Sequence, residues 1–252
     1  MILAIDIGNT STHFGLFNGK KLVKAWRFPT NRLTNYPMAR QARHPSHPEL
    51  CRGTNQLTDL QTIVSSVVPS ASKIIKKLFP KAIFISHKNA GVKVKLKKPA
   101  EVGIDRLVNA VAAYSLYGGP AIIIDFGTAT TFDVISAKGE YLGGAIAPGI
   151  VLARDALHER TAKLPKIEIK APKHVIGKST TEAIQSGLVY GYVAMVEGMI
   201  KRIKSDSRFT VHDPRIITTG GYAKLIGKYA RGIAIIDTEL TLKGLNIICQ
   251  KN

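Results

Sequence analysis

The residues best suited to chemistry lie in two Asp-x-Gly runs, each directly after a stretch of apolar residues. In the first run, Asp6 and Gly8 are followed by side chains with hydroxyl or amide groups: Asn9, Thr10, Ser11 and Thr12. In the second run, Asp125 and Gly127 are followed by Thr128 and two further threonines. Glycine lets the backbone approach a phosphate closely, amides and hydroxyls bond its oxygens, and a carboxylate holds Mg²⁺ directly or through water. The pattern favours a phosphate and metal site.

Either run alone has a simpler interpretation as a strand-ending turn, because Asp and Gly are common turn residues. The two runs belong, however, to a longer repeat: an apolar strand, the Asp-x-Gly turn, a second strand-like run at 12–17 or 131–135, and a glycine turn typical of a hairpin. Two such copies predict two lobes of similar build, whose turns face one another across a cleft and hold a nucleotide from both sides. We therefore expect a two-lobed phosphotransferase.

The boundary between the lobes is predicted at residues 117–120, Tyr-Gly-Gly-Pro, because paired glycines end a helix and proline prevents its continuation. The N-terminal lobe is then 1–119 and the C-terminal lobe 120–252. Helical spacing of apolar residues predicts helices at 101–116 and 181–204. Further strands are predicted at 62–67, 82–86, 215–219 and 234–237, so the fold class is α/β.

Gly103-Ile-Asp-Arg106 is expected to open the helix in front of this boundary. The helix dipole favours an aspartate in a first helical turn, so Asp105 has a simple interpretation as a helix-start charge paired with Arg106. In a cleft, the same carboxylate can accept the proton of a substrate hydroxyl. Phosphoryl transfer depends on positioning more than on a strong base, so an aspartate with an ordinary pKa suffices. Arg106 can then bind a substrate carboxylate through two hydrogen bonds.

Other patterns are weaker. The run from Gly177 to Thr180 resembles the end of a Walker A loop, but Pro172 stands where that loop needs glycine. His44 and His47 lack a third metal ligand and are interpreted as surface residues. Residues 29–56, with four prolines among polar residues, are expected to be irregular, and Trp26 is expected to pack on a strand face.

The net charge is high, because 36 Lys and Arg stand against 17 Asp and Glu and leave +19. This balance is typical of proteins with an anionic partner, either nucleic acid or phosphate. The excess is spread along the chain without a docking motif or interleaved aromatic residues, so we expect a solvated basic surface and no nucleic acid. Two cysteines, Cys51 and Cys249, and no apolar run of membrane length predict a cytoplasmic protein that does not contact a membrane.

In their order along the chain, the motifs resemble those of one family, the type III pantothenate kinases, which catalyse the first step of coenzyme A synthesis. The resemblance covers nearly the whole chain. Each motif alone is weak evidence, but the full series in this order is specific to the family. The matching runs are Asp6–Thr10, Ser65–Pro69, Gly103–Arg106, Asp125–Thr131, Gly143–Gly149, Leu164-Pro165, Ala183–Gly187, Thr219–Ala223 and Leu240–Leu245. The resemblance implies two RNase H-like lobes of the actin-like and sugar-kinase type with a cleft between them.

The same resemblance implies roles for single residues. Residues 6–13 hold the phosphates of ATP, with Asp6 binding Mg²⁺ through water, and Thr128 contacts ATP. Asp105 accepts the proton of the primary hydroxyl of pantothenate. The pantothenate site is lined by Gly103, Ile104, Asp105, Arg106 and Thr180. Asp125 holds a monovalent cation, K⁺ or NH₄⁺, and Gly220 and Gly221 lie near the nucleotide. The family is usually dimeric, so we expect a homodimer.

One departure from the family pattern concerns the pantothenate pocket. The family usually has Tyr-x-Asn-Pro before the Gly-x-Asp-Arg element, whereas this chain has Leu96-Lys-Lys-Pro99. With Leu96 and Lys98 in one wall of the pocket, altered affinity is expected rather than lost activity. Two alternatives stay open: a transcription-associated nucleic-acid-binding regulator on the same fold, and a kinase or phosphatase for another small hydroxy acid.

Overall fold

The structure, a computed structural model, describes residues 1–35, 60–207 and 213–251. By its internal contacts the chain forms two compact units. Unit 1 consists of Met1–Val92, Lys97–Ser115 and Leu240–Asn252, and unit 2 consists of Lys93–Leu96 and Leu116–Glu239. Among the described residues, no helix is both long enough and apolar enough to cross a membrane.

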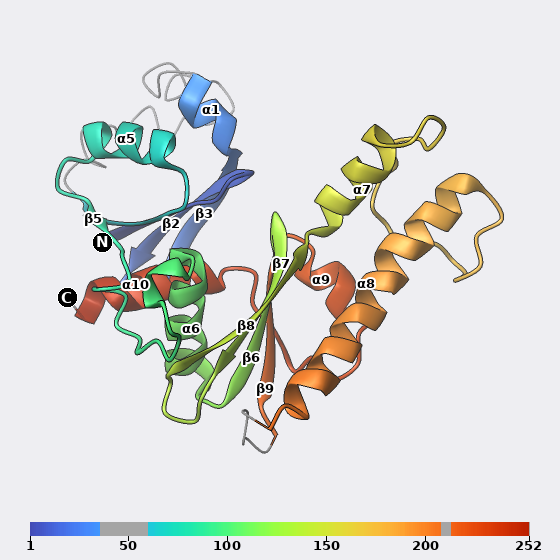
Figure 1. Cartoon of the computed structure of the whole chain (residues 1–252). Coiled ribbons are helices and arrows are strands. Elements are labelled where there is room, and N and C mark those ends of the chain that lie inside the picture. The colour runs from blue at the N-terminus through green and yellow to red at the C-terminus, as the bar shows by residue number, and fades with distance from the viewer. Residues whose placement is uncertain (36–59, 208–212, 252) are drawn as a thin grey trace. The chain divides into compact units, whose positions relative to one another are not determined.

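Unit 1 is built on a five-stranded sheet with the order β3-β2-β1-β4-β5 (Figure 1). Its strands are β1 (Ile2–Ile7), β2 (Ser11–Asn18), β3 (Lys21–Pro29), β4 (Gln61–Ser66) and β5 (Ile83–Phe84). Its helices are α1 (Thr30–Asn35), α5 (Pro69–Leu78), the 3₁₀ helix η1 (Pro99–Glu101), most of α6 (Ile104–Tyr117) and α10 (Leu240–Lys251). β1 pairs antiparallel with β2 and parallel with β4.

Strand β1 is apolar along almost its whole length because it is covered on both faces. Leu3, Ile5 and Ile7 pack in one cluster with Ala71 and Ile75 of α5, while α10 also contacts β1. Continuous apolar runs of this kind are typical of strands buried on both sides. Packing on both faces therefore holds the carboxyl end of β1 in place, and Gly8 begins the turn to β2 directly after it.

Unit 2 repeats this architecture with the sheet order β10-β9-β6-β7-β8. Its strands are β6 (Ala121–Phe126), β7 (Ala129–Ile135), β8 (Tyr141–Pro148), β9 (Arg215–Gly220) and β10 (Ile235–Ile236), and its helices are α7 (Ile150–Glu159), α8 (Thr180–Lys204) and α9 (Ala223–Gly227). β6 pairs antiparallel with β7 and parallel with β9, as β1 does with β2 and β4. The repeat seen in the sequence is thus a repeat of the folded unit, which confirms the α/β prediction.

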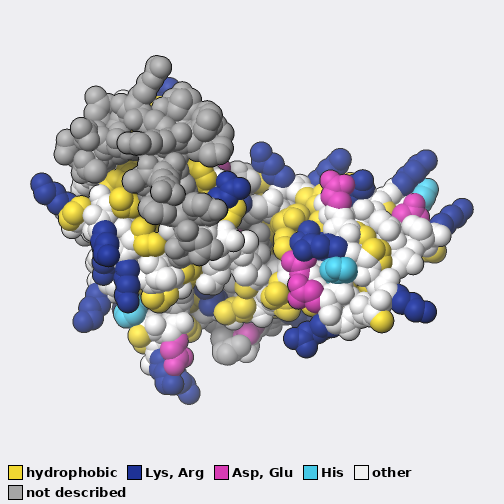
Figure 2. Space-filling view, turned by 90° about the horizontal axis from the view of Figure 1, so that it is seen from above, with side chains coloured by type: hydrophobic (Ala, Val, Ile, Leu, Met, Phe, Trp, Pro, Cys, Tyr) yellow, Lys and Arg dark blue, Asp and Glu magenta, His cyan; other side chains and the backbone are white. Residues whose placement is uncertain are grey.

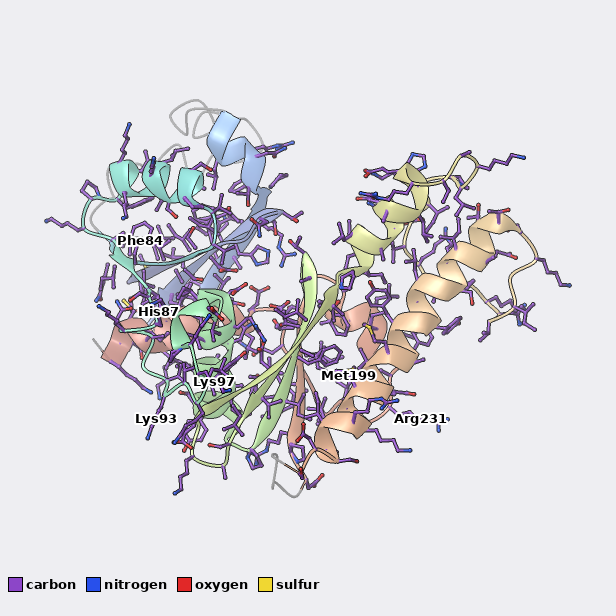
Figure 3. The ribbon with its side chains drawn as sticks, viewed as in Figure 1. Phe84, His87, Lys93, Lys97, Met199 and Arg231 are labelled. Carbon is purple, nitrogen blue, oxygen red and sulfur yellow. The ribbon has the colours of Figure 1, made fainter. Side chains whose placement is uncertain are left out.

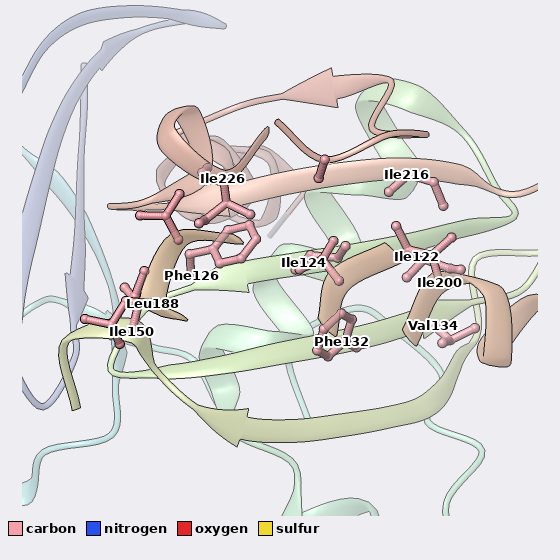
Figure 4. Packing of buried hydrophobic residues seen from close by; sticks show 14 of the residues in the cluster. Ile122, Ile124, Phe126, Phe132, Val134, Ile150, Leu188, Ile200, Ile216 and Ile226 are labelled. Carbon is pink, nitrogen blue, oxygen red and sulfur yellow. The ribbon is translucent and has the colours of Figure 1, made fainter. Parts of the chain in front are cut away.

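The core of unit 2 lies between its sheet and helices α8 and α9 (Figure 4). Ile122, Ile124 and Phe126 alternate along β6, so all three face the same side of the sheet. They pack in one cluster with Leu188 of α8 and Ile226 of α9. Burial of this apolar surface holds the carboxyl end of β6, and with it Asp125, in place.

Most predicted elements agree with the structure, with small differences at their ends. The helices expected at 101–116 and 181–204 are α6 and α8, and Gly118, with φ 77°, ends α6 as the glycine pair indicated. Trp26 packs on a strand face, stacked on Phe14 with ring centroids 5.6 Å apart. The structure assigns Leu240–Asn252 to unit 1, whereas the prediction placed these residues in the second lobe.

The expectation that residues 29–56 are irregular is wrong for its first part. Pro29 ends β3 and Thr30 begins α1, because Thr30 is buried and bonded to the turn after β1. The remainder of the segment, including His44, His47 and Cys51, lies outside the described residues.

Candidate functional site

The turn between β1 and β2 is held in shape from within unit 1. The Gly8 N–H donates to the carbonyl of Ser11 at 3.1 Å, and the Thr30 N–H donates to the carbonyl of Thr10 at 3.0 Å. The Thr30 hydroxyl donates to the Gly8 carbonyl at 2.6 Å, and the hydroxyl of Thr12 lies 3.0 Å from that of Thr30. The turn is therefore preorganised by Thr30, which sequence reasoning missed because it stands 22 residues from Gly8.

These contacts divide the predicted phosphate-binding residues into two kinds. Asn9 and Thr10 are exposed and Ser11 is half-buried, so solvent reaches these three residues. Thr12 is fully buried and its hydroxyl meets Thr30. Thr12 thus supports the shape of the turn, while its neighbours present the groups that can meet a phosphate.

Asp6 lies one residue before the end of β1 and has polar neighbours on both sides. The strand register places His13 of β2 and Ser65 of β4 directly beside it. The Nδ1 atom of His13 accepts a hydrogen bond from the Arg27 guanidinium at 3.0 Å. Burial, and then the positive charge of Arg27, lowers the pKa of His13 to about 3. His13 is therefore neutral at physiological pH.

Asp105 stands in the first turn of α6, as the sequence indicated. Its Oδ1 atom accepts a hydrogen bond from the Arg106 N–H at 2.9 Å. A Cβ atom on Gly103 would lie only 2.6 Å from that same Oδ1, so the carboxylate occupies space that glycine leaves open. Burial raises the pKa of Asp105, against the lowering effect of the backbone N–H and the charge of Arg106. The group is a stronger proton acceptor than an aspartate of ordinary pKa, which would already suffice for phosphoryl transfer.

The turn after β6 in unit 2 is one residue tighter than its counterpart in unit 1. Asp125 is opposite Thr131, and the Gly127 N–H donates to the carbonyl of Ala129 at 3.1 Å. The Gly149 N–H donates to the carbonyl of Thr128 at 3.1 Å. A Cβ atom on Gly149 would overlap that carbonyl, so only glycine lets the start of α7 approach the turn this closely.

Gly220 makes a second close approach at this turn. It ends β9 with φ 88°, a left-handed conformation that favours glycine, and a Cβ atom there would overlap Oδ1 of Asp125. The same Cβ would lie 2.7 Å from backbone atoms of Phe126. Glycine is therefore needed at position 220 for the carboxylate of Asp125 to keep its place.

The Walker-like run before α8 is a helix start. The Ser179 side chain caps α8 by accepting from the Glu182 N–H at 3.2 Å, and Glu182 accepts from the Lys178 N–H at 2.7 Å. This reciprocal arrangement is a capping box. It uses the hydroxyl and backbone groups that a phosphate loop would offer, and it leaves Thr180 exposed at the first position of the helix.

The segment Lys93–Leu96 joins the sheet edge of unit 2. Lys95 donates its N–H to the carbonyl of Tyr141 at 2.8 Å, and Tyr141 donates back to the carbonyl of Lys93 at 2.8 Å. The ammonium groups of Lys93, labelled in Figure 3, and Lys95 lie 3.6 and 3.2 Å from Glu140. A Cβ atom on Gly143 would lie 3.2 Å from Leu96, the residue that replaces the tyrosine of the family pattern.

Each unit thus brings its own predicted site residues together. In unit 1 these are the turn at 8–12 with Asp6, and Gly103 with Asp105; in unit 2 they are Asp125, Thr128 and Gly220. Within residues 1–35, 60–207 and 213–251, no three His, Cys, Asp or Glu side chains gather as a metal cage.

Comparison with known proteins identifies one family. The family model described as type III pantothenate kinase matches residues 2–202. The type III pantothenate kinase of Halalkalibacterium halodurans is 46% identical over 263 residues, covering 100% of both chains. That of Desulforapulum autotrophicum is 44% identical over 263 residues, covering 100% of this chain and 97% of its own.

Solved structures show the same fold at low sequence identity. A putative Baf family transcriptional activator from Campylobacter jejuni has a TM-score of 0.64 at 19% identity, covering 99% of this chain and 98% of its own. A putative 2-dehydro-3-deoxygalactonokinase from Sinorhizobium meliloti has a TM-score of 0.59 at 12% identity, covering 100% and 99%. These likenesses carry the fold alone, which is that of the actin-like ATPases and sugar kinases.

Proposed function

The chain belongs to the type III pantothenate kinase family, and from that premise we propose how its residues divide the work of catalysis. The enzyme transfers a phosphate group from ATP to pantothenate, a reaction of coenzyme A biosynthesis. We propose roles for its residues, the metal ions that it binds and its oligomeric state.

We propose that the turn at 8–11 binds the phosphates of ATP. Its exposed amides and the side chains of Asn9, Thr10 and Ser11 offer the donors, and the bonds to Thr30 hold these donors in place before ATP arrives. Because the turn is already ordered, less conformational entropy is lost on binding. Thr12 contributes through Thr30 rather than by its own contact with a phosphate.

Mg²⁺ fits the donors around Asp6. This ion prefers oxygen ligands, keeps several waters and is usually bound through one or two carboxylates plus substrate phosphates. Asp6 supplies one carboxylate, and the hydroxyl of Ser65 beside it is buried without a hydrogen-bond partner among the described residues. A water of the ion held by Asp6 would satisfy that hydroxyl. When bound, Mg²⁺ neutralises charge on the phosphates.

We propose that Asp125 holds a monovalent cation, K⁺ or NH₄⁺, and that Thr128 contacts ATP. The groups at this turn that could act as cation ligands are oxygens, namely the carboxylate of Asp125 and backbone carbonyls. Oxygen ligands of this kind suit a hard cation. Gly220 supports the proposal, because its missing side chain gives the Asp125 carboxylate its position.

Asp105 is proposed as the acceptor of the proton from the primary hydroxyl of pantothenate. In a loose transition state for phosphoryl transfer, orientation of the hydroxyl matters most, and the raised pKa of Asp105 strengthens its hold on that proton. Arg106 binds the pantothenate carboxylate, and Gly103, Ile104 and Thr180 complete the pocket. The observation that carries this assignment is the buried Asp105 carboxylate seated over Gly103.

The decisive experiment measures phosphopantothenate formed from ATP and pantothenate with Mg²⁺ and K⁺ present. The Asp105→Asn variant should lose a factor of about 10²–10⁴ in kcat, the usual contribution of a general base. The matched control is Glu101→Gln, which removes an exposed carboxylate paired with Lys98 just before the same helix. Full activity of Asp105→Asn would overturn the role proposed for Asp105. A preference for another hydroxy acid in a substrate panel would show that pantothenate is not the main substrate.

We propose further that the enzyme is a homodimer in which a second copy covers exposed apolar side chains of unit 2. Ile146, Leu152, Val175 and Ile176 are 65, 53, 65 and 85% exposed. Scattered apolar residues on a surface are ordinary, but neighbouring ones as exposed as Val175 and Ile176 are typical of interaction sites. Because Thr180 follows them closely in sequence, the contact with the second copy would lie near the pantothenate pocket.

A further inference from the structure

A row of polar side chains crosses four strands of unit 1 at the level of Asp6. The register pairs Asp6 with His13 and with Ser65, and pairs His13 with Arg27. Side chains at paired positions of neighbouring strands lie on the same face of a sheet. Arg27, His13, Asp6 and Ser65 therefore form one line on one face, next to the proposed phosphate-binding turn.

The equivalent row in unit 2 has a different chemistry. There Asp125 pairs with Thr131 and Thr219, and Thr131 pairs with Ile146. Thr131 donates its hydroxyl to Asp133 at 3.0 Å. Since the two sheets share their topology, the fold itself does not require a histidine and an arginine at this level. The His13–Arg27 pair is specific to the unit that holds Asp6.

The contact between His13 and Arg27 determines which imidazole nitrogen carries the proton. A guanidinium has only donors, so Nδ1 of His13, 3.0 Å from Arg27, is the acceptor. The single N–H is then on Nε2. Arg27 is on β3, and β2 lies between β3 and β1. The ring edge opposite Nδ1, which carries Cδ2 and Nε2, is therefore the edge on the side of β1 and Asp6.

We propose that His13 and Arg27 are positioning residues that orient the Asp6 carboxylate toward the turn at 8–11 and thereby set the affinity for Mg²⁺-bound nucleotide. Arg27 holds the imidazole in one tautomer, and the imidazole N–H restrains the carboxylate without touching the nucleotide. Groups that orient a ligand of a metal in this way commonly change metal affinity by about 10–100-fold when they are removed. This inference rests on the role proposed above for Asp6.

The test measures binding of ADP by calorimetry with and without Mg²⁺. His13→Phe, which keeps a ring and removes both nitrogens, should weaken binding about tenfold with Mg²⁺ and leave it unchanged without Mg²⁺. His13→Asn, which keeps a donor, should recover part of the loss. Arg27→Gln should produce a smaller loss of the same kind. His87→Phe, at an exposed histidine of the same unit (Figure 3), is the matched control and should bind as the wild type does.

Kinetics give a second readout. The KM for ATP should rise in His13→Phe by the same factor as the binding constant, while the KM for pantothenate stays within about twofold of wild type, because Asp105 and Arg106 are not touched. A merely structural role would lower the melting temperature and affect both substrates. Equal changes in both KM values would overturn the inference.

Asp6→Asn separates this inference from the proposed function. If Asp6→Asn leaves Mg²⁺-dependent ADP binding unchanged, the role proposed for Asp6 fails. If Asp6→Asn weakens binding and His13→Phe does not, only the positioning role fails. Nitrogen-15 NMR of the His13 ring adds a readout without activity: we expect the Nε2–H tautomer, with Nδ1 as the acceptor, and a shifted Nε2 resonance in Asp6→Asn. A proton on Nδ1, or a resonance that does not move, would contradict the inference.

Discussion

Asp105 shows how the surroundings of a single residue set its chemistry. Desolvation raises its pKa, while the N–H and the charge of Arg106 act in the opposite direction. A carboxylate in this state binds a proton more tightly than a solvated one, which a proton acceptor needs. The same desolvation means that the ionised group costs the folded protein stability at neutral pH.

This cost gives a prediction for stability. Because the pKa of Asp105 is raised in the folded state, the stability that its protonated form contributes is present in acid and lost as the pH rises through the raised pKa. Asp105→Asn stays neutral, so at pH 7 it should raise the melting temperature while it removes activity. The gain should shrink near pH 4. Thermal unfolding of both proteins at the two pH values tests this, and a lower melting temperature at pH 7 would contradict it.

Gly220 gives a second prediction at this scale. Gly220→Ala places a Cβ against Asp125 and Phe126 in a backbone with φ 88°, so it should destabilise the protein by about 1–3 kcal/mol and weaken activation by K⁺. Gly191→Ala is the matched control in the interior of α8, where nothing lies within 4 Å of the added Cβ. The control should stabilise by about 0.5–1 kcal/mol. Urea unfolding measures both changes.

At the scale of elements, partly buried hydrogen bonds hold α6 and the start of α10, where the chain passes from one unit to the other. Within unit 2, the Tyr117 hydroxyl donates to Oδ2 of Asp237 at 2.7 Å. Within unit 1, the Thr241 hydroxyl donates to Oδ1 of Asn109 at 2.7 Å. Burial, followed by the hydrogen bond and charge of Asp237, raises the pKa of Tyr117 to about 12, so this donor keeps its proton throughout the physiological range.

Removal of the Tyr117 hydroxyl should therefore be costly. Tyr117→Phe takes a donor from the buried carboxylate of Asp237 and should lower the free energy of unfolding by about 1.5–3 kcal/mol, the range for hydrogen bonds to charged groups. Tyr114→Phe, at a tyrosine of the same helix that is 41% exposed, should change it by less than about 0.5 kcal/mol. Equal effects in urea unfolding would show that the bond to Asp237 contributes nothing.

At the scale of the whole molecule, one sheet topology is used twice, and the two copies carry different side chains beside the aspartates of their Asp-x-Gly turns. Unit 1 has His13 and Arg27 beside its aspartate, whereas unit 2 has Thr131 and Ile146.

On the face shown in Figure 2, Lys and Arg side chains stand singly or in small groups. That a net charge of +19 brings no nucleic acid partner stays a prediction, and DNA binding that falls steeply with salt would contradict it. The cytoplasmic location also stays a prediction.

The dimer prediction belongs to this scale. Sedimentation equilibrium should give the mass of two chains, and Ile176→Asp, which places a charge in the proposed contact, should shift the protein toward the monomer and raise the KM for pantothenate. Val23→Asp, at an apolar residue of β3 that is 55% exposed, is the control and should leave the mass unchanged. A monomeric wild-type protein would overturn the proposal.

The order of the motifs indicated the family, and local patterns predicted the α/β repeat and the positions of its acidic turns. These follow from local rules, since an apolar run of strand length ending in Asp-x-Gly specifies a strand and its turn, and helical spacing specified α6 and α8. Residues that act through distant partners were beyond such rules. Thr30 falls in the segment predicted to be irregular, although it holds the turn at Gly8, and no local pattern predicts the raised pKa of Asp105.

These points required the folded chain, because burial and strand register bring together residues that are far apart in the sequence. The register places Arg27 beside His13, and His13 beside Asp6. Packing buries Asp105 and raises its pKa, and α10 returns from the end of the chain to cover β1. Desolvation and pairing depend on three-dimensional neighbours, and a linear pattern of residue types does not contain them.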